Sequence, residues 1–434
     1  MRQASLIFFL IMIQLGRADI LSLRDAQGLL LKNNLDVLTA EEEVAKASNE
    51  LTGTYASYWP SLDVTGSYNY LTEKSRLNVR IPSPLPGASP IVIDKTMGGN
   101  DRAECGLNLS YPFFTGFQRY YAVMGKKEVV AIKQATLEGT KNRASLNLGQ
   151  LYLQWELSYK QVLLRQALVE QLETYTKQLV AMLESGTIQR SKLLDAQARL
   201  QLARVDVEAA KDQGDSLGLE IKAMLLLKDA SIGPDTSGMV FDTLPVPKVP
   251  KTTRPELVAL DHATAQVEAM RASLKFRHFL VISGLAGLRY GRPGLNLGRD
   301  AYMGYGLVGV QAQWNLFDGF KVQTEKELIE RQINFIDIER TRQTEFFSRS
   351  FTLARQQFRS AGNRLMAAES ARDAAEALAE DCKNSLSAGT ITNAEYLTAL
   401  VNLAQARLLV EQVRTMKKMA LLKVMYTAGI IIIF

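Results

Sequence analysis

The chain has 434 residues, of which 47% are hydrophobic, and its 51 basic and 45 acidic residues leave a net charge of +6. This composition predicts folded material, long enough for two or three ordinary domains. The charges form no long basic run, so a nucleic-acid-binding protein is not predicted. The two cysteines, Cys105 and Cys382, suggest no disulfide framework, and we interpret both as packing residues.

The first eighteen residues have the pattern of an export signal. Arg2 gives a basic start, an apolar run covers residues 6–15, and small residues precede Asp19 at positions 16 and 18. The run is too short to cross a bilayer as a helix. We predict a signal peptide over residues 1–18, in preference to an uncleaved anchor or a buried first helix. No cysteine follows the site, so lipid attachment there is not expected.

The mature chain opens with a helix and a β-hairpin. Residues 23–58 are helix formers with an apolar repeat, and Pro60 ends the helix because proline lacks the amide hydrogen that continues it. Apolar and polar side chains then alternate over residues 61–71, which predicts a strand. Residues 81–100 hold four prolines and three glycines, which indicates a loop. A second alternating strand completes a β-hairpin over residues 61–114.

Two long helices are expected next. Residues 117–185 contain no proline and carry overlapping helical apolar patterns, which indicates a helix of about 100 Å with more than one neighbour. A break at Gly186 and Thr187 separates it from a returning helix over residues 190–228. The seam of the returning helix alternates steps of three and four residues, as in a coiled coil: Leu193, Ala196, Leu200, Ala203, Val207 and Ala210.

The same order of elements returns 203 residues later. Residues 183–208 and 386–411 are identical at 11 of 26 aligned positions, and residues 106–117 match residues 309–320 at the same offset. The chain is therefore a tandem duplication. We divide it into a first repeat over residues 19–228, a proline- and glycine-rich linker over residues 229–255, and a second repeat over residues 256–434.

The second repeat is expected to contain the same elements as the first. After an opening helix, a β-hairpin is predicted over residues 280–317 and a long helix over residues 320–387. A break at Gly389 and Thr390 leads into a returning helix over residues 390–426.

Each chain thus offers four amphipathic strands of about ten residues, the length that a tilted strand needs to cross a bilayer. Four strands cannot close, and an open sheet in lipid leaves unpaired backbone groups that cost several kcal/mol each. Three chains would supply twelve strands. The apolar seams of the helices are likewise best satisfied in a closed ring, so we predict a hollow oligomer, with a barrel in the membrane and a helical cylinder below it.

Several short motifs carry a family resemblance. They are Trp59-Pro60-Ser61-Leu62, the strand ends at residues 111–116 and 314–319, and Ser185-Gly186-Thr187 leading to residues 193–197. In order, spacing and duplication, these motifs resemble the TolC-like outer-membrane efflux family over nearly the whole mature chain.

The resemblance implies a mainly α fold with a transmembrane β part. Such a protein is a trimeric 12-stranded β-barrel in the cell outer membrane, with four strands from each chain, continued by a long periplasmic α-helical barrel with coiled-coil hairpin tips. It implies the exit duct of a tripartite efflux or type I secretion system. The partners are two further copies of the chain, a periplasmic adaptor protein, an inner-membrane pump of the RND, ABC or MFS class, and outer-membrane lipid. The linker would form a belt around the cylinder.

The hairpin tips are the candidate functional positions. Reversing a helix needs a residue without a β-carbon, which is a sufficient structural reason for Gly186 and Gly389. In the resembling family the tips also dock the adaptor, and the corresponding residues here are Gly186, Thr187, Ile188, Gly389, Thr390 and Ile391.

The residues just after the tips are candidates for the tunnel entrance. The family typically carries acidic residues six and nine positions after the second glycine. This chain has Glu395 and Thr398 there, and Lys192 and Asp195 in the first copy, so it keeps only part of the pattern. Glu395, Asp195 and Lys192 are therefore either entrance residues or ordinary solvated helix residues.

No enzyme is predicted. His262 and His278 have no acid or nucleophile at a telling spacing, and no phosphate loop, metal cluster or cofactor motif occurs, so both histidines are interpreted as helix-surface residues. A periplasmic adaptor is the main alternative, but adaptors lack duplicated strands of membrane length. A non-transporting envelope scaffold leaves the aromatic residues near the strand ends unexplained, since membrane interfaces favour them.

Overall fold

The computed structural model describes residues 19–85, 87–228, 232–236, 246–247, 253–292, 294–295 and 300–430. The predicted signal peptide and most of the linker lie outside these ranges. The chain forms two compact units. Unit 1 comprises residues 1–44, 133–260 and 338–434, and unit 2 comprises residues 45–132 and 261–337.

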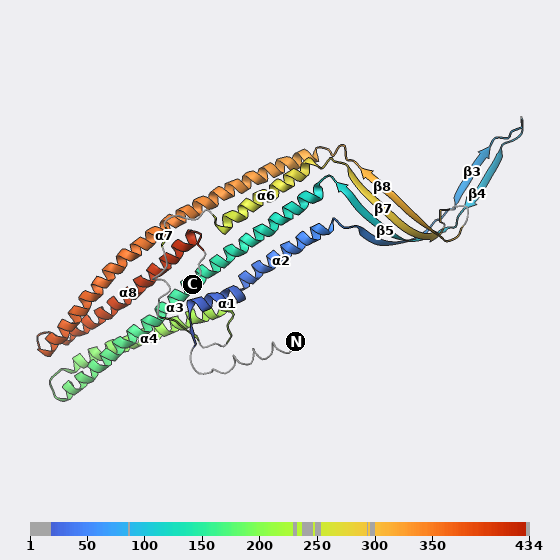
Figure 1. Cartoon of the computed structure of the whole chain (residues 1–434). Helices are drawn as coiled ribbons and strands as arrows, with labels where there is room; N and C mark the ends of the chain where they lie inside the picture. Colours follow the sequence, from blue (N-terminus) through green and yellow to red (C-terminus); the bar gives the residue numbers. More distant parts are fainter. Residues whose placement is uncertain are drawn as a thin grey trace, which may run out of the picture. The chain divides into compact units, whose positions relative to one another are not determined.

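The elements follow the predicted order, and Figure 1 labels most of them. In chain order they are β1 (Asp19–Leu21), α1 (Leu23–Asn33), α2 (Leu35–Ala56), β2 (Ser61–Tyr70), β3 (Ser75–Ile81), β4 (Ile91–Met97), β5 (Asp101–Thr115), α3 (Gln118–Glu184), α4 (Arg190–Leu225), β6 (Ile232–Pro234), α6 (Pro255–Lys275), β7 (Val281–Arg292), β8 (Met303–Gln313), α7 (Lys321–Ser387) and α8 (Asn393–Thr427).

The duplication is visible in the helices. Helices α3 and α7 are both 67 residues long, and both their first and their last residues are 203 positions apart. The turn from strand to helix repeats as well, because Gly116 and Phe117 share positive φ angles with Gly319 and Phe320. At Gly116 a β-carbon would lie 2.8 Å from the Cβ of Phe279, so glycine is needed there for space as well as for conformation.

The predicted first helix is divided at Asn34. The backbone there has φ −64° and ψ 128°, outside the helical region. The Asn34 side chain accepts hydrogen bonds from the N–H groups of Asp36 at 3.0 Å and Val37 at 3.3 Å. The prediction of one continuous helix was therefore wrong, because this side chain satisfies the first N–H groups of a new helix.

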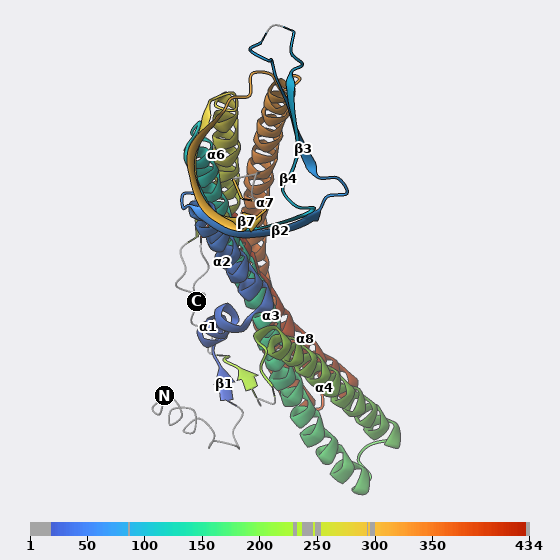
Figure 2. The same cartoon turned by 90° about the vertical axis from the view of Figure 1, so that its right-hand side faces the viewer.

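Unit 2 contains a four-stranded antiparallel sheet in the order β2-β5-β7-β8. Figure 1 shows β5, β7 and β8 side by side, and Figure 2 shows β2 and β7 curving together. Each predicted hairpin forms, and the β5–β7 pairing joins the two repeats into one sheet. The second hairpin ends earlier than predicted, since β8 stops at Gln313 instead of residue 317.

A two-stranded ribbon lies within the segment predicted as a loop. Strands β3 and β4 pair from Ser75–Met97 to Ile81–Ile91. All four prolines of the segment fall in residues 82–90, between the two strands, where they cannot interrupt the ladder. The loop prediction was therefore wrong for residues 91–97, whose β-branched run favours a strand.

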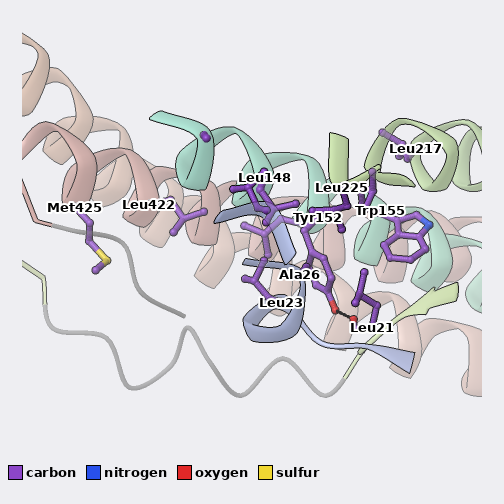
Figure 3. Packing of buried hydrophobic residues seen from close by; sticks show 14 of the residues in the cluster. Leu21, Leu23, Ala26, Leu148, Tyr152, Trp155, Leu217, Leu225, Leu422 and Met425 are labelled. Atoms are coloured by element: carbon purple, nitrogen blue, oxygen red, sulfur yellow. Dashed lines mark hydrogen bonds between the residues drawn. The ribbon is translucent and has the colours of Figure 1, made fainter. Parts of the chain in front are cut away.

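Unit 1 has its largest hydrophobic core where α3 meets the start of the mature chain. Figure 3 shows Leu148, Tyr152 and Trp155 of α3 packed with Leu21, Leu23 and neighbouring residues. The Tyr152 hydroxyl donates a hydrogen bond to the Leu21 carbonyl at 2.7 Å and accepts one from the Asp235 N–H at 2.8 Å. Burial raises the pKa of Tyr152 above its ordinary value. This hydroxyl therefore fastens both β1 and the segment after β6 to α3.

The predicted heptad seam of α4 is buried in full. All six of its residues are among the core of unit 1: Leu193, Ala196, Leu200, Ala203, Val207 and Ala210. Charged groups connect the two repeats nearby. Glu156 of α3 has a side chain only 6% exposed, and its carboxylate lies 2.7 Å from Lys160 Nζ and 3.4 Å from Lys418 Nζ of α8. The buried carboxylate is thus paired, as its desolvation requires.

Arg254 fastens the start of α6 to the end of α8. The side chain is 3% exposed, and its guanidinium donates hydrogen bonds to the carbonyls of Tyr426 and Thr427, both at 2.8 Å. It also lies over the Phe347 ring at 3.4 Å. A cation at a helix C-terminus satisfies carbonyls that lack a partner within the helix.

Candidate functional site

The sheet of unit 2 has one wholly apolar central face. In the pairing register, Val64 lies opposite Leu107, Leu107 opposite Leu288, and Leu288 opposite Gly306. The next row joins Leu109, Ala286 and Val308. These side chains are not covered by the chain, since Val64 is 73% and Val308 is 89% exposed. An exposed apolar face of this extent indicates contact with lipid or another apolar surface.

Aromatic side chains border this face at both ends. Tyr58, Trp59, Tyr111 and Phe113 lie at the end near the helices, and Tyr68, Tyr70, Tyr290 and Tyr302 lie at the other end. Nine residue steps separate Trp59 from Tyr68, which is roughly 30 Å along a strand. At a tilt of about 40° they rise about 23 Å, close to the apolar band of about 25 Å in outer-membrane barrels.

The opposite face of the sheet is polar and cross-linked. Arg289 of β7 donates a hydrogen bond to the Glu104 carboxylate of β5 at 2.7 Å, and the Tyr305 hydroxyl of β8 donates to the same carboxylate at 2.9 Å. Asn108 donates to Thr65 Oγ1 at 2.9 Å. The Glu104 contacts join the two repeats and were not predicted, because these residues are 185 or more positions apart.

The two hairpin tips share one geometry. Gly186 and Gly389 both have φ +75°. The Gly186 N–H donates to the Leu183 carbonyl and the Thr187 N–H to the Met182 carbonyl, and equivalent bonds form at Gly389. This is the Schellman termination, which requires a left-handed residue after the helix. The structural role predicted for the two glycines is thus what the backbone shows.

The threonines after the glycines have a local role too. Thr187 Oγ1 donates to the Met182 carbonyl at 2.8 Å, and Thr390 Oγ1 donates to the Ser385 carbonyl at 3.0 Å. Each hydroxyl therefore satisfies a carbonyl at the end of a long helix. The repeated Gly-Thr pair needs no partner to explain it, although the glycine and threonine are exposed at both tips.

The tips are held side by side by a shared core in unit 1. Ile188 and Leu183 pack against a buried cluster of α3 and α4 to which α8 contributes Leu397. The rings of Tyr175 and Tyr396 meet edge to face, with centroids 5.3 Å apart. Burial raises the pKa of Tyr175 to about 12. The structure thus brings the six predicted adaptor-contact residues to one end of unit 1.

Glu395 has a defined structural partner at the start of α8. Its carboxylate accepts a hydrogen bond from the Thr392 N–H at 2.7 Å, while Thr392 Oγ1 accepts from the Glu395 N–H. This is a capping box. The bonds from Thr392 hold the pKa of Glu395 below its ordinary value. The Thr-x-x-Glu spacing was readable in the sequence as a helix start and was missed there.

The two other entrance candidates lie on the first turns of α4. Asp195 faces Arg199, one turn further on, at 3.4 Å, and Lys192 is exposed. The roles of Lys192, Asp195 and Glu395 at a tunnel entrance depend on neighbouring chains, and stay predictions.

The histidines and cysteines differ in part from expectation. His262 Nδ1 lies 2.7 Å from a Glu128 carboxylate oxygen, so this histidine does have an acidic partner, 134 residues away in sequence. His278 contacts the Asn315 carbonyl at 3.0 Å.

Cys105 is exposed on the apolar sheet face and is not a packing residue, whereas Cys382 packs beside Ala379. Across the described ranges no group of three or more metal-ligating side chains occurs.

Among the residues that the structure describes, no helix is both long enough and apolar enough to span a bilayer.

Residues 26–224 match the family model described as outer membrane efflux protein. The matched residues make up most of the first repeat, which is thus similar to this family. The fold continues the match through the second repeat, as the solved structures below show. The resemblance to TolC-like proteins is thus confirmed, and with it an outer-membrane efflux duct that is not an enzyme. This assignment favours the duct over the adaptor and scaffold alternatives.

Solved efflux channels share the fold of this chain. The structure of CusC superposes with a TM-score of 0.76 at 15% identity, covering 96% of each chain. CmeC of Campylobacter jejuni gives 0.71 at 16% identity, covering 94% of this chain and 85% of its own. MtrE of Neisseria gonorrhoeae, solved in an open state, gives 0.73 at 13% identity, covering 94% and 89%. The shared fold confirms the predicted fold class of a mainly α chain with a β part and an internal duplication. No curated protein sequence matches this efflux protein.

Proposed function

We propose that this efflux protein is the exit duct of a tripartite efflux or type I secretion system. Three chains form a 12-stranded barrel in the outer membrane and a helical tunnel in the periplasm. An inner-membrane pump of the RND, ABC or MFS class delivers cargo to this tunnel through a periplasmic adaptor. The observation that carries the proposal is the open four-stranded sheet with an apolar face.

The open edges of the sheet support assembly with further copies. Strands β2 and β8 each have a neighbour on one side only. In a bilayer every unpaired N–H and C=O group on these edges costs several kcal/mol, so the edges must pair. Pairing β8 of one chain with β2 of the next continues the sheet, and three copies supply twelve strands. The polar face with Glu104 and Arg289 then lines the lumen.

The assembly is tested by extracting the protein from outer-membrane fractions in mild detergent. We expect a complex with the mass of three chains that dissociates on heating and forms channels in planar bilayers. Recovery of a monomer from the soluble periplasmic fraction would contradict the proposal.

The hairpin tips are the proposed adaptor-docking site. The contact residues are those predicted, from Gly186 to Ile188 and from Gly389 to Ile391. Since the threonine hydroxyls are engaged within the tips, a photo-reactive residue is better placed at the exposed neighbours Gln189 and Ala388. We expect both positions to cross-link a periplasmic protein in cells, and the exposed position Gln213, further along α4, to give no such product. Equal cross-linking at all three positions would argue against docking at the tips.

The entrance is proposed to be lined by Glu395, Asp195 and Lys192. Glu395→Lys is expected to change ion selectivity or conductance in planar bilayers, whereas Glu41→Lys on α2 leaves both unchanged. Because Glu395 also caps α8, Glu395→Gln is needed as a second variant, since it removes the charge without reversing it. Unchanged selectivity, conductance and pH response in both Glu395 variants would exclude this residue from the entrance.

A further inference from the structure

The apolar face of the sheet is hollowed at the end near the helices. A groove of about 740 Å³ lies there, with Gly284 and Ala286 of β7 as its floor. Leu109 of β5 and Val308 of β8 flank this floor, and Trp59 also lines the groove. All of these residues belong to unit 2.

The register explains why the groove exists. Ala286 lies between Leu109 and Val308 on one face, so a small side chain is flanked by two larger ones. One row further on, the Phe113 ring lies against Gly284. A β-carbon at Gly284 would be 2.4 Å from the Phe113 ring, so a larger residue there would have to move the ring. Two successive positions of β7 on the apolar face, Gly284 and Ala286, are therefore small.

The lining is suited to hydrocarbon. It contains no charged side chain, and its polar side-chain groups are confined to Tyr58, Trp59 and Tyr111. Ligand pockets of about 300–1,000 Å³ with mainly apolar and aromatic linings are typical of small-molecule sites, and this groove has that size. The aromatic groups stand at the helical end, where an amphipathic ligand changes from apolar to polar.

A cation lies at the same end. The Arg119 guanidinium is 4.8 Å from the centre of the Tyr58 ring, which lines the groove. It donates hydrogen bonds to the Ser57 carbonyl at 2.8 Å, to Thr115 Oγ1 at 3.2 Å, and to the Pro112 carbonyl. A guanidinium has five N–H donors, so these bonds orient it without using all of its capacity. Within the described ranges no carboxylate pairs with Arg119, which leaves its charge to act on an anion.

We propose that this groove binds one acyl chain of a phospholipid from the leaflet nearer the helices, with the phosphate close to Arg119. The inference rests on the proposed function, because the apolar face is then the membrane-facing surface, and the groove is continuous with it. The ligand is an amphipathic lipid anion held by shape at its chain and by charge at its head.

The test uses the assembled protein after extraction and repeated detergent washing. Phospholipid that stays bound is counted by native mass spectrometry and identified after release. Ala286→Trp fills the groove, and Val64→Trp adds the same side chain to the same face outside it. We expect wild type and Val64→Trp to keep roughly one phospholipid per chain, and Ala286→Trp to retain it about tenfold more weakly. Arg119→Gln is expected to release phospholipid more readily while the protein still assembles.

A photo-reactive residue makes the test independent of Ala286→Trp. In washed protein, Val308→p-benzoylphenylalanine is expected to cross-link phospholipid, and Val64→p-benzoylphenylalanine is not. Washed wild type that assembles and conducts but holds no phospholipid, or holds a peptide or another apolar compound in the groove, would overturn the inference alone. A protein that neither reaches the outer membrane nor conducts would instead overturn the proposed function.

Discussion

If the apolar face of the sheet faces the membrane, a charged side chain placed on it should lower the stability of the protein. The loss should depend on the depth of that side chain in the bilayer. Val64 lies five residues after Trp59 and four before Tyr68, so it is close to the middle of the apolar band. Leu62 is three residues from Trp59 and thus nearer the interface. Arginine in place of either residue would face hydrocarbon, whereas Thr65→Arg points to the polar face.

The expected loss of stability follows from where each substituted residue lies in the bilayer. A charged side chain at the bilayer midplane of a barrel costs about 2–4 kcal/mol, and one near the interface about 0–1 kcal/mol. Val64→Arg is therefore expected to destabilise a three-chain assembly by about 6–12 kcal/mol, and Leu62→Arg by clearly less. Thr65→Arg loses only the hydrogen bond from Asn108, worth about 1 kcal/mol per chain.

Urea unfolding of protein refolded into phospholipid vesicles measures these differences, and the fraction of heat-resistant oligomer on gels gives a second readout. The expected order of stability is Thr65→Arg and Leu62→Arg above Val64→Arg. If Thr65→Arg is as damaging as Val64→Arg, or if Leu62→Arg costs as much as Val64→Arg, the assignment of faces or of depth is wrong.

Three further predictions concern single contacts. Gly186→Ala forces φ +75° on a residue with a β-carbon and is expected to lower the free energy of unfolding in urea by about 1 kcal/mol. The control is Gly125→Ala within α3, where a β-carbon meets nothing within 4 Å, and this change should raise the free energy of unfolding by about 0.5–1 kcal/mol. The lowered pKa of Glu395 means that its cap is present above the ordinary value of 4.5 and is lost as pH falls through the lower folded value. The protection of the amides at the start of α8 against hydrogen exchange, relative to an unfolded chain at the same pH, should therefore fall in acid in the wild type and show no such step in Glu395→Gln. Arg254→Leu leaves two carbonyls at the end of α8 without their donor and should lower stability by about 1–3 kcal/mol in thermal melting. Arg271→Leu breaks an exposed ion pair and should lower it by only about 0–1 kcal/mol. Equal losses in the two variants would contradict the role given to Arg254.

The sequence by itself determined the elements whose causes are local. The helical period of residues 117–185 and the heptad seam beginning at Leu193 predicted α3 and the buried face of α4, because both depend on side chains within a few turns. The alternation along residues 61–71 predicted which side chains of β2 share a face. The offset of 203 predicted two equal helices, and the glycines at 186 and 389 predicted where they turn.

Other features were decided only by the tertiary structure. Strand β5 pairs with β7 of the other repeat, which places Glu104 beside Arg289 and Ala286 beside Leu109. The pairing also creates the groove and the polar lining, and neither has a pattern within one strand. Contacts of this kind depend on which segments the topology brings together.

At two other places, opposing local preferences made the prediction from sequence wrong. Prolines between residues 82 and 90 hid the β3–β4 ribbon, and the helical composition around Asn34 hid a helix start. In both places two local preferences were of similar strength, about 1 kcal/mol or less per residue. Hydrogen bonding in the folded chain, to a partner strand or to an asparagine side chain, decided between them.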